Sequence, residues 1–414
     1  MSLFLLLFVF QLPAFAAQIL VPMDNAQRNH LKAYGIAYHV LTYDVEVSWL
    51  LNYRGGSFLF EHHREFEQEL VVRGVSYQVI ADVQAAAILR EIADPDVNMD
   101  EIRLHKVPRI AVYSPPNSLP WDDAVTLALT FAEIPYDVVY DEEVLSGVLP
   151  LYDWLHLHHE DFTGQFGKFW FAYRNHEWYQ EDVRLAQETA RRLGFSKVSH
   201  LKLAVAKKIR DFVAGGGYMF AMCSAPESID IALAAEGVDI LHEVYDGDPV
   251  EPGAQEKLDF SRTFAFQNFT VITDPTIYEK SNIDVPKTGR DRRTDFFTLF
   301  EFSAKWDQVP TMLTQSHESV IKGFMGQTTA FRNELIKPTV TILGETQAKQ
   351  EARYIHGSLG NGTFTFLGGH DPEDYQHFVG DPPTDLNLHP NSPGYRLILN
   401  NVLFPAARKK PQKT

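Results

Sequence analysis

The sequence predicts an α/β fold built around a doubly wound, mostly parallel sheet. Three observations lead to this class. Short aliphatic runs such as RIAVY are each ended by turn residues, they alternate with amphipathic segments of helical length, and polar side chains follow several runs directly. Strands that helices cover on both faces have this composition, because neither face of the sheet meets water.

The N-terminus carries an apolar stretch followed by Ala14-Phe15-Ala16, a small-x-small pattern of the kind that signal peptidase cuts. We therefore expect residues 1–16 to be a signal peptide and the protein to be exported, to the periplasm or the outside of a bacterial cell. The stretch is too short to span a bilayer as a retained helix, so no transmembrane segment is expected in the mature form. A buried N-terminal strand is the alternative interpretation.

Residues 17–105 are expected to form an N-terminal α/β region. QILVPMD and VEVSWLLN predict strands, with a helix over residues 25–41 between them. EFEQELVVRG and VQAAAILREIAD predict two further helices, and SYQVI predicts an extended segment between those two. The polar, turn-rich stretch DPDVNMDEIRLHK then places a domain boundary near residue 105.

A cleaner β/α series predicts one domain over residues 106–405. RIAVYSPP, YDVVYDEEV, YDWLHLHHEDF and GGYMFAM are its expected strands, and helices are expected over residues 120–132 and, with a break at Gly194, 181–214. Ligands of doubly wound sheets bind at the carboxyl ends of the strands. We therefore expect the functional site in the loops that follow these strands.

Two segments interrupt or end this domain. The regular alternation lapses over residues 246–335, which we interpret as an insertion, and it resumes with TVTIL and GTFTFLGG. The second of these strands is expected to form a hairpin whose turn is Gly360-Asn361-Gly362. Residues 406–414 form a basic tail.

The composition limits the possible partners. A formal charge of −17 disfavours nucleic acid and anionic membranes, which both require clustered Lys and Arg. The single cysteine excludes an internal disulfide. We expect a small-molecule, sugar or peptide ligand and no cofactor; the aromatic stretch FGKFWFAYRNHEWY suits a sugar or peptide platform, although core packing explains it equally well.

Cys223 ends the apolar run GGYMFAM and precedes SAPESIDIALAA, which predicts a helix. A thiol at a strand-to-helix junction is placed as a nucleophile, because the first amides of the helix favour the thiolate. Ser224 and Glu227 have the spacing of a capping box, and the small residues Ala221 and Ala225 suit a sharp turn. A buried structural cysteine is the alternative.

A matching base is offered by GTFTFLGGHDPEDYQHF, in which His370 follows a strand and two glycines. Asp371, Glu373 and Asp374 are close enough in sequence to orient its ring, which is the general logic of a catalytic triad. His370 should stand at the same edge of the sheet as Cys223. The alternative is a solvated loop histidine.

Cys223 on its elbow and GGHDPE after a later strand resemble the Cys and His-Pro-Glu elements of the class I glutamine amidotransferase-like superfamily, over about residues 106–245 and 337–405. The resemblance implies a flavodoxin-like three-layer fold. It also implies that Cys223 is the nucleophile, His370 the base and Glu373 the orienting carboxylate. The oxyanion loop of the family would correspond to HHEDF, with His159 and Glu160 beside Ser224.

The chain departs from the family's motifs in three places. Alanines replace both glycines of the Gly-x-Cys-x-Gly elbow, HHEDF lacks glycine, and Asp371 separates His370 from Pro372. Such departures occur in non-amidotransferase branches, including the trehalose-utilisation-like proteins, which LGGHD near PGYRLILNNVLF also resembles. The whole chain resembles exported bacterial proteins labelled asparagine synthetase B, yet that enzyme's N-terminal cysteine and Ser-Gly-Gly pyrophosphate loop are absent.

A metal site is a competing interpretation of HLHHED. His156 and His158 share one face of a strand, and His159, Glu160 and Asp161 follow in the loop. Further ligands for zinc would come from the following residues: His62, His63, His370 and Asp371.

The sequence thus favours an exported cysteine-dependent amide hydrolase or amidotransferase-like protein. The alternatives are a non-catalytic carbohydrate or peptide binding module on the same fold, or a zinc-dependent hydrolase.

Overall fold

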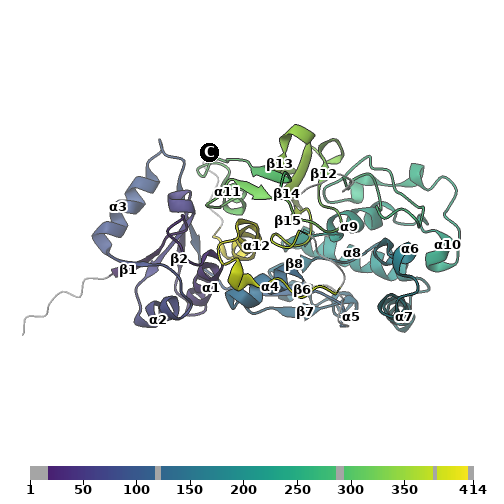
Figure 1. The fold of residues 1–414 in the computed structure, drawn as a ribbon, viewed down its shortest axis with the longest axis horizontal. Coiled ribbons are helices and arrows are strands. Elements are labelled where there is room, and N and C mark those ends of the chain that lie inside the picture. The colour runs from purple at the N-terminus through teal and green to yellow at the C-terminus, as the bar shows by residue number, and fades with distance from the viewer. Residues whose placement is uncertain (1–16, 117–122, 286–292, 376–379, 409–414) are drawn as a thin grey trace, which may run out of the picture.

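The computed structural model describes residues 17–116, 123–285, 293–375 and 380–408, so the expected signal peptide and most of the basic tail lie outside the described residues. These residues form two sheets with helices packed on both faces of each (Figure 1). The expected α/β class is therefore observed, but the expectation of a mostly parallel sheet is wrong, because the first sheet is antiparallel and the second is parallel only in part.

The first sheet is five-stranded and antiparallel, in the order β4-β1-β3-β2-β5. Its elements are β1 (Ala17–Val21), α1 (His30–Leu41), β2 (Val47–Leu51), β3 (Ser57–Glu61), α2 (Arg64–Val72), β4 (Gln78–Ala81), α3 (Asp82–Ala93) and β5 (Asp100–Leu104). β5 lies within the stretch that the sequence indicated as a polar boundary. It is a strand because Ile102 and Leu104 are buried on one face while Arg103 points to solvent.

The second sheet has a parallel half in the order β7-β6-β8-β9-β15. Its strands are β6 (Ile110–Tyr113), β7 (Asp137–Val139), β8 (Trp154–Leu157), β9 (Tyr218–Met222) and β15 (Gly362–Leu367). The helices α4 (Ala124–Ala132) and α12 (Pro393–Leu403) cover one face, and α5 (Asp141–Ser146), α8 (Val198–Gly215) and α9 (Ala225–Ala234) cover the other. A further helix, α7 (Glu177–Arg192), precedes α8, and the predicted break at Gly194 falls between them.

Antiparallel strands extend this sheet beyond β15. They are β10 (Phe296–Leu299), β11 (Val320–Lys322), β12 (Phe331–Arg332), β13 (Thr341–Thr346) and β14 (Glu351–Leu359), and the shorter helices α6 (Trp170–Tyr173), α10 (Glu243–Asp246) and α11 (Gln308–Leu313) lie in the connections. The predicted insertion thus supplies strands β10, β11 and β12 to the main sheet. The β14–β15 hairpin is confirmed: Leu359 pairs with Gly362, and Gly360 has a φ of +60° in the turn.

One continuous apolar cluster joins the two sheets, because α1 packs against both α4 and α12. Figure 1 shows α12 between the N-terminal sheet and the larger sheet. Buried Arg396 of α12 reinforces the junction, since its guanidinium donates to the Tyr34 hydroxyl and to the carbonyls of Met23 and Gly55. No helix among the described residues combines the length and apolar character needed to cross a membrane.

Candidate functional site

Cys223 lies on a strained turn between β9 and α9. Its φ is +55°, in the left-handed region that non-glycine residues seldom adopt, and its side chain is only 3% exposed. The turn is held from both sides: the Cys223 amide donates to the Gly369 carbonyl (2.9 Å), and the Ala225 amide donates to the His158 carbonyl (3.1 Å). The thiol is therefore fixed between the loops that follow β8 and β15.

The predicted capping box at this turn is wrong. Ser224 makes no side-chain cap; its hydroxyl donates to the Glu160 carbonyl (3.3 Å). Glu227 instead accepts hydrogen bonds from the Ser281 (2.6 Å) and Thr328 (2.8 Å) hydroxyls. Glu227 is buried, so its carboxylate needs hydrogen-bond donors, and these come from distant residues rather than from the Ser224 amide at the start of α9.

Three histidines converge on Cys223. One ligand atom from each of His158, His159, Cys223 and His370 lies within 4.8 Å of every other. The imidazole centroids are 3.8 Å apart for His158 and His159, 4.6 Å for His158 and His370, and 4.4 Å for His159 and His370. These residues follow β8, β9 and β15, which are neighbours in the sheet, so the predicted meeting of Cys223 and His370 at one sheet edge is observed.

Close backbone packing fixes the position of His370. Its amide donates to the Met325 carbonyl (2.6 Å), and the preceding Gly369 has a φ of +94°. A Cβ at Gly326, whose φ is +126°, would lie 2.5 Å from the His370 Cβ. Only glycine is compatible with this approach, so the loop before β12 holds the imidazole over the thiol.

The carboxylate that contacts this cluster is Asp123, which the sequence interpretation did not single out. Its Oδ1 caps α4 by accepting from the Val125 (2.8 Å) and Thr126 (2.9 Å) amides, which is why the helix begins after Asp123. Its Oδ2 lies 3.1 Å from His156 Nε2 and 2.9 Å from His158 Nδ1. Burial alone would raise the pKa of Asp123, but the two imidazoles hold it well below its ordinary value, so the carboxyl is ionised.

His158 is neutral near pH 7. Burial lowers its pKa from 6.5 to about 4, although Asp123 acts in the opposite direction. The contact between Nδ1 and Asp123 is short without having the alignment of a regular hydrogen bond, and it favours the tautomer that carries the proton on Nδ1. Nε2 then presents a lone pair, and it has no hydrogen-bond partner among the described residues.

Asp371 and Glu373, which follow His370 in sequence, contact groups outside the histidine cluster. Asp371 accepts from the Glu373 (2.7 Å) and Asp374 (3.0 Å) amides through Oδ1 and from the Tyr395 hydroxyl through Oδ2 (2.5 Å), so it organises the turn. The Glu373 carboxylate lies 3.5 Å from Nδ1 of His389.

The other histidines considered for a metal site, which are His62, His63 and His156, have contacts outside the cluster around Cys223. His156 Nδ1 lies 3.3 Å from the Phe220 carbonyl, and its Nε2 contacts Asp123. His62 and His63 belong to the N-terminal region, where they lie 2.9 Å from Glu67 and 3.8 Å from Glu61. The structure therefore brings His158, His159 and His370 together and leaves His62 and His63 elsewhere.

A buried polar network adjoins the cluster at Glu160. Lys202 donates to the hydroxyls of Tyr113 (3.0 Å) and Tyr140 (2.9 Å) and to Asp141 (3.1 Å), and it lies 3.6 Å from the Glu160 carboxylate. Burial raises the pKa of Glu160 to about 7, although Lys202 opposes this shift. A cavity of about 60 Å³ lies between this network and the cluster; its lining includes His159, Glu160, Asp161 and Lys202. Sequence reasoning missed Lys202, because its partners are distant along the chain.

Tyr278 is a second residue that sequence reasoning missed. The pKa of Tyr278 is raised well above 10 because its hydroxyl is shielded from water and lies near the Cys223 sulfur, although the residue as a whole is 38% exposed. The Phe169 ring, which belongs to the aromatic stretch FGKFWFAYRNHEWY, lies 6.1 Å from the Tyr278 ring.

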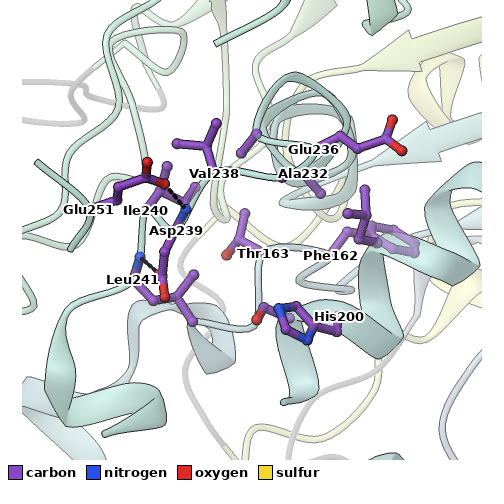
Figure 2. Close-up of a pocket in the computed structure, with 14 residues that line it drawn as sticks. Phe162, Thr163, His200, Ala232, Glu236, Val238, Asp239, Ile240, Leu241 and Glu251 are labelled. Carbon is purple, nitrogen blue, oxygen red and sulfur yellow. Dashed lines mark hydrogen bonds between the residues drawn. The ribbon is translucent and has the colours of Figure 1, made fainter. Parts of the chain in front are cut away.

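A larger hollow of about 510 Å³ lies between α8, α9 and the segment that follows α9 (Figure 2). Its carboxylates stabilise the surrounding loop: Glu251 accepts from the Asp239 amide (3.2 Å), Asp239 from the Leu241 amide (2.9 Å), and Glu236 pairs with Lys207 and Arg262. We therefore place the functional site at Cys223, where thiol and imidazole chemistry converge, rather than in this hollow.

Comparisons with known proteins give no family. No family model matches the chain, and no curated protein matches it. Among solved structures, the chain is similar to two cytoplasmic proteins of Salmonella typhimurium, STM3548 (8% identity, 73% of this chain and 100% of that chain, TM-score 0.36) and STM1381 (11%, 72% and 100%, TM-score 0.37). It is also similar to a catalytic mutant of Gan42B, a GH42 beta-galactosidase from G. stearothermophilus (11%, 64% and 27%, TM-score 0.26). Similarity at this level identifies neither a shared fold nor a shared activity.

Proposed function

We propose that this chain is a cysteine-dependent amide hydrolase of the glutamine amidotransferase-like type, with Cys223 as its nucleophile. The observation that carries the proposal is the thiol on a strained strand-to-helix turn, with an imidazole nitrogen of His370 within 4.8 Å. The strand order β7-β6-β8-β9-β15 supports it, because numbering these strands along the chain gives 2-1-3-4-5, the flavodoxin-like order. The apolar N-terminal stretch supports the associated proposal of export.

In the proposed reaction, His370 takes the thiol proton and the Cys223 thiolate attacks the amide carbonyl. The C–N bond then breaks, and the imidazolium returns its proton to the departing amine or ammonia. This leaves a thioester on Cys223. A water molecule, deprotonated by His370, attacks the thioester to release the acid and restore the thiol.

The backbone suggests which amide stabilises the oxyanion. The amides of Cys223 and Ala225 already donate to the Gly369 and His158 carbonyls. The residue after the nucleophile supplies the oxyanion donor in strand-to-helix elbows, so we assign this role to the Ser224 amide. The loop that contains His159 and Glu160 would lie on the opposite side of the substrate carbonyl from the Ser224 amide, beside the small polar cavity.

Glu373 was expected to orient His370, and its carboxylate lies 3.5 Å from His389 Nδ1. Asp123 acts in this proposal as a positioning residue for His158: it lies 2.9 Å from His158 Nδ1, and its negative charge stands behind the ring that stacks on His370. His158 remains neutral because of its burial, so it does not place a second positive charge beside the imidazolium that forms on His370.

The test is hydrolysis of a panel of small carboxamides by the full chain, followed as ammonia release in the presence of a chelator. Replacing the nucleophile, Cys223→Ala, should lower turnover at least about 10³-fold, while circular dichroism and thermal melting show that the variant is folded. Equal turnover by the variant would remove the thiol from the reaction. Failure of both proteins on every carboxamide, with specific binding of a sugar or peptide, would favour the binding module.

A further inference from the structure

We infer that His158, His159, Cys223 and His370 form a binding site for a borderline-soft divalent cation such as Zn²⁺, and that the bound metal would occupy the thiol. The four ligand atoms lie within 4.8 Å of one another, and they come from the ends of three adjacent strands, β8, β9 and β15. This set supplies three imidazole nitrogens and one sulfur.

The spacing is close to what a tetrahedral metal requires. Zinc bonds of about 2.0–2.1 Å to nitrogen and about 2.3 Å to sulfur place neighbouring ligand atoms about 3.3–3.6 Å apart. Ligand atoms at separations of up to 4.8 Å would move closer together on binding, and the stacked rings of His158 and His159 would turn apart to direct both lone pairs at one metal. A ligand set of imidazoles and thiolate selects Zn²⁺, Co²⁺ or copper and discriminates against Mg²⁺ and Ca²⁺, which prefer oxygen.

The surroundings of His158 point independently to a ligand. The side chain is 2% exposed, and its Nε2 has no hydrogen-bond partner among the described residues. A buried polar atom without a partner is costly, and a metal would satisfy it. Asp123 stands behind the ring, 2.9 Å from Nδ1, in the arrangement by which carboxylates orient metal-binding histidines.

The neighbouring group of Asp123, His156 and His158 is a weaker candidate. It offers three ligands rather than four. Asp123 Oδ1 already accepts two helix amides, and His156 Nδ1 lies against the Phe220 carbonyl. We therefore assign His158 to the site that contains Cys223.

Four protein ligands fill a tetrahedral coordination sphere and leave no position for a reactive water. A metal in this site would consequently block the Cys223 thiolate rather than replace it as the catalyst. Metal binding itself is independent of the proposed hydrolase activity, whereas the inhibitory consequence rests on it.

The experiment is a titration of the metal-free full chain with Co²⁺, followed by visible and near-ultraviolet absorption and then by displacement with Zn²⁺. We expect one equivalent to bind, with tetrahedral ligand-field bands and a sulfur-to-cobalt charge-transfer band. Cys223→Ser should lose the charge-transfer band, and His159→Ala, which changes the partly exposed ligand, should weaken binding at least tenfold. His356→Gln, which alters a buried histidine outside the cluster, is the matched control and should bind Co²⁺ as the wild type does.

An unchanged spectrum in Cys223→Ser, or equal affinity in folded His159→Ala, would overturn the site. Activity separates this inference from the proposed function. If the metal-free protein hydrolyses amides and one equivalent of Zn²⁺ stops this activity, the blocking role is supported. If Zn²⁺ increases the activity, the blocking role is overturned. Co²⁺ binding with the expected spectrum in a protein that hydrolyses no amide would leave the metal site standing while the hydrolase proposal fails.

Discussion

Two stacks of wholly or partly buried histidines among the described residues have different surroundings. In one, the rings of His30 and His317 lie 4.0 Å apart at the junction of α1 with the loop after α11. In the other, the rings of His158, His159 and His370 lie 3.8 to 4.6 Å apart at the edge of the parallel sheet. Burial lowers the pKa of His30 to about 4, the same direction and size as for His158.

The difference lies in the hydrogen bonds. His30 has an oxygen 3.0 Å from each ring nitrogen, Asn391 Oδ1 from Nδ1 and the Met23 carbonyl from Nε2, and the neutral ring donates to one of them. His158 has Asp123 beside Nδ1, but its Nε2 has no hydrogen-bond partner among the described residues and points into a cluster that contains a thiol. Stacking and a lowered pKa are therefore not enough to indicate function. What distinguishes the second stack is that His158 Nε2 lacks a hydrogen-bond partner among the described residues and lies next to the Cys223 thiol.

The largest contrast between the stacks should come from removing one imidazole of each. His370→Gln should lower kcat/KM for amide hydrolysis about 10²–10⁴-fold, because the general base is lost. His317→Gln should leave hydrolysis unchanged and reduce the free energy of unfolding by about 1–3 kcal/mol, because it breaks a buried stack and a contact with Arg396. Steady-state kinetics and urea unfolding measure the two effects. A similar loss of activity in both variants would erase the distinction between the stacks.

A smaller effect on activity or stability is expected from replacing the polar side chain that contacts a ring of each stack. Asp123→Asn retains an oxygen that can cap α4 but removes the negative charge behind His158, so activity should fall roughly 10–100-fold with little loss of stability. Asn391→Ala removes the partner of His30 and should cost about 1–3 kcal/mol in stability without a change in kcat. Finding that Asp123→Asn affects stability alone would make Asp123 a helix cap and nothing more.

The smallest effect concerns pH. The pKa of His30 is lowered from 6.5 to about 4, so the unfolded chain binds this proton while the folded chain does not. The free energy of unfolding should therefore decrease as the pH falls from about 6.5 to about 4. His30→Gln should reduce that slope by at most about 1.4 kcal/mol per pH unit. Urea unfolding at several pH values gives the slopes, and equal slopes for the variant and the wild type would contradict the assignment.

The sequence was sufficient to predict that Cys223 and His370 lie close together. Each directly follows an aliphatic run with turn residues, and the carboxyl ends of neighbouring parallel strands lie at one edge. Asp123 was missed because it belongs to a helix cap, a position where aspartate has an ordinary structural explanation. The capping box at Ser224 was wrong because tertiary hydroxyls from Ser281 and Thr328 compete for Glu227, and no local pattern reveals them.

The boundaries of the sheets were harder to predict than the site. β5 has the sequence DEIRL, whose two apolar side chains are outnumbered by polar ones within a turn-rich stretch. β10, β11 and β12 are short and partly exposed, so they lack the fully buried apolar runs that mark strands such as β6 and β8. Their place in the sheet is set by pairing with distant strands rather than by local composition.

Alkylation of Cys223 by chloroacetamide, a small electrophile that mimics an amide, tests most directly whether the thiol is activated. The metal-free folded chain, the folded His370→Gln variant and the denatured wild type would be compared by peptide mass spectrometry. We expect Cys223 to react faster in the folded wild type than in the denatured chain, despite its 3% exposure, and His370→Gln to slow the folded reaction markedly. A thiol that stays inert in the folded protein and reacts only after denaturation would contradict the account.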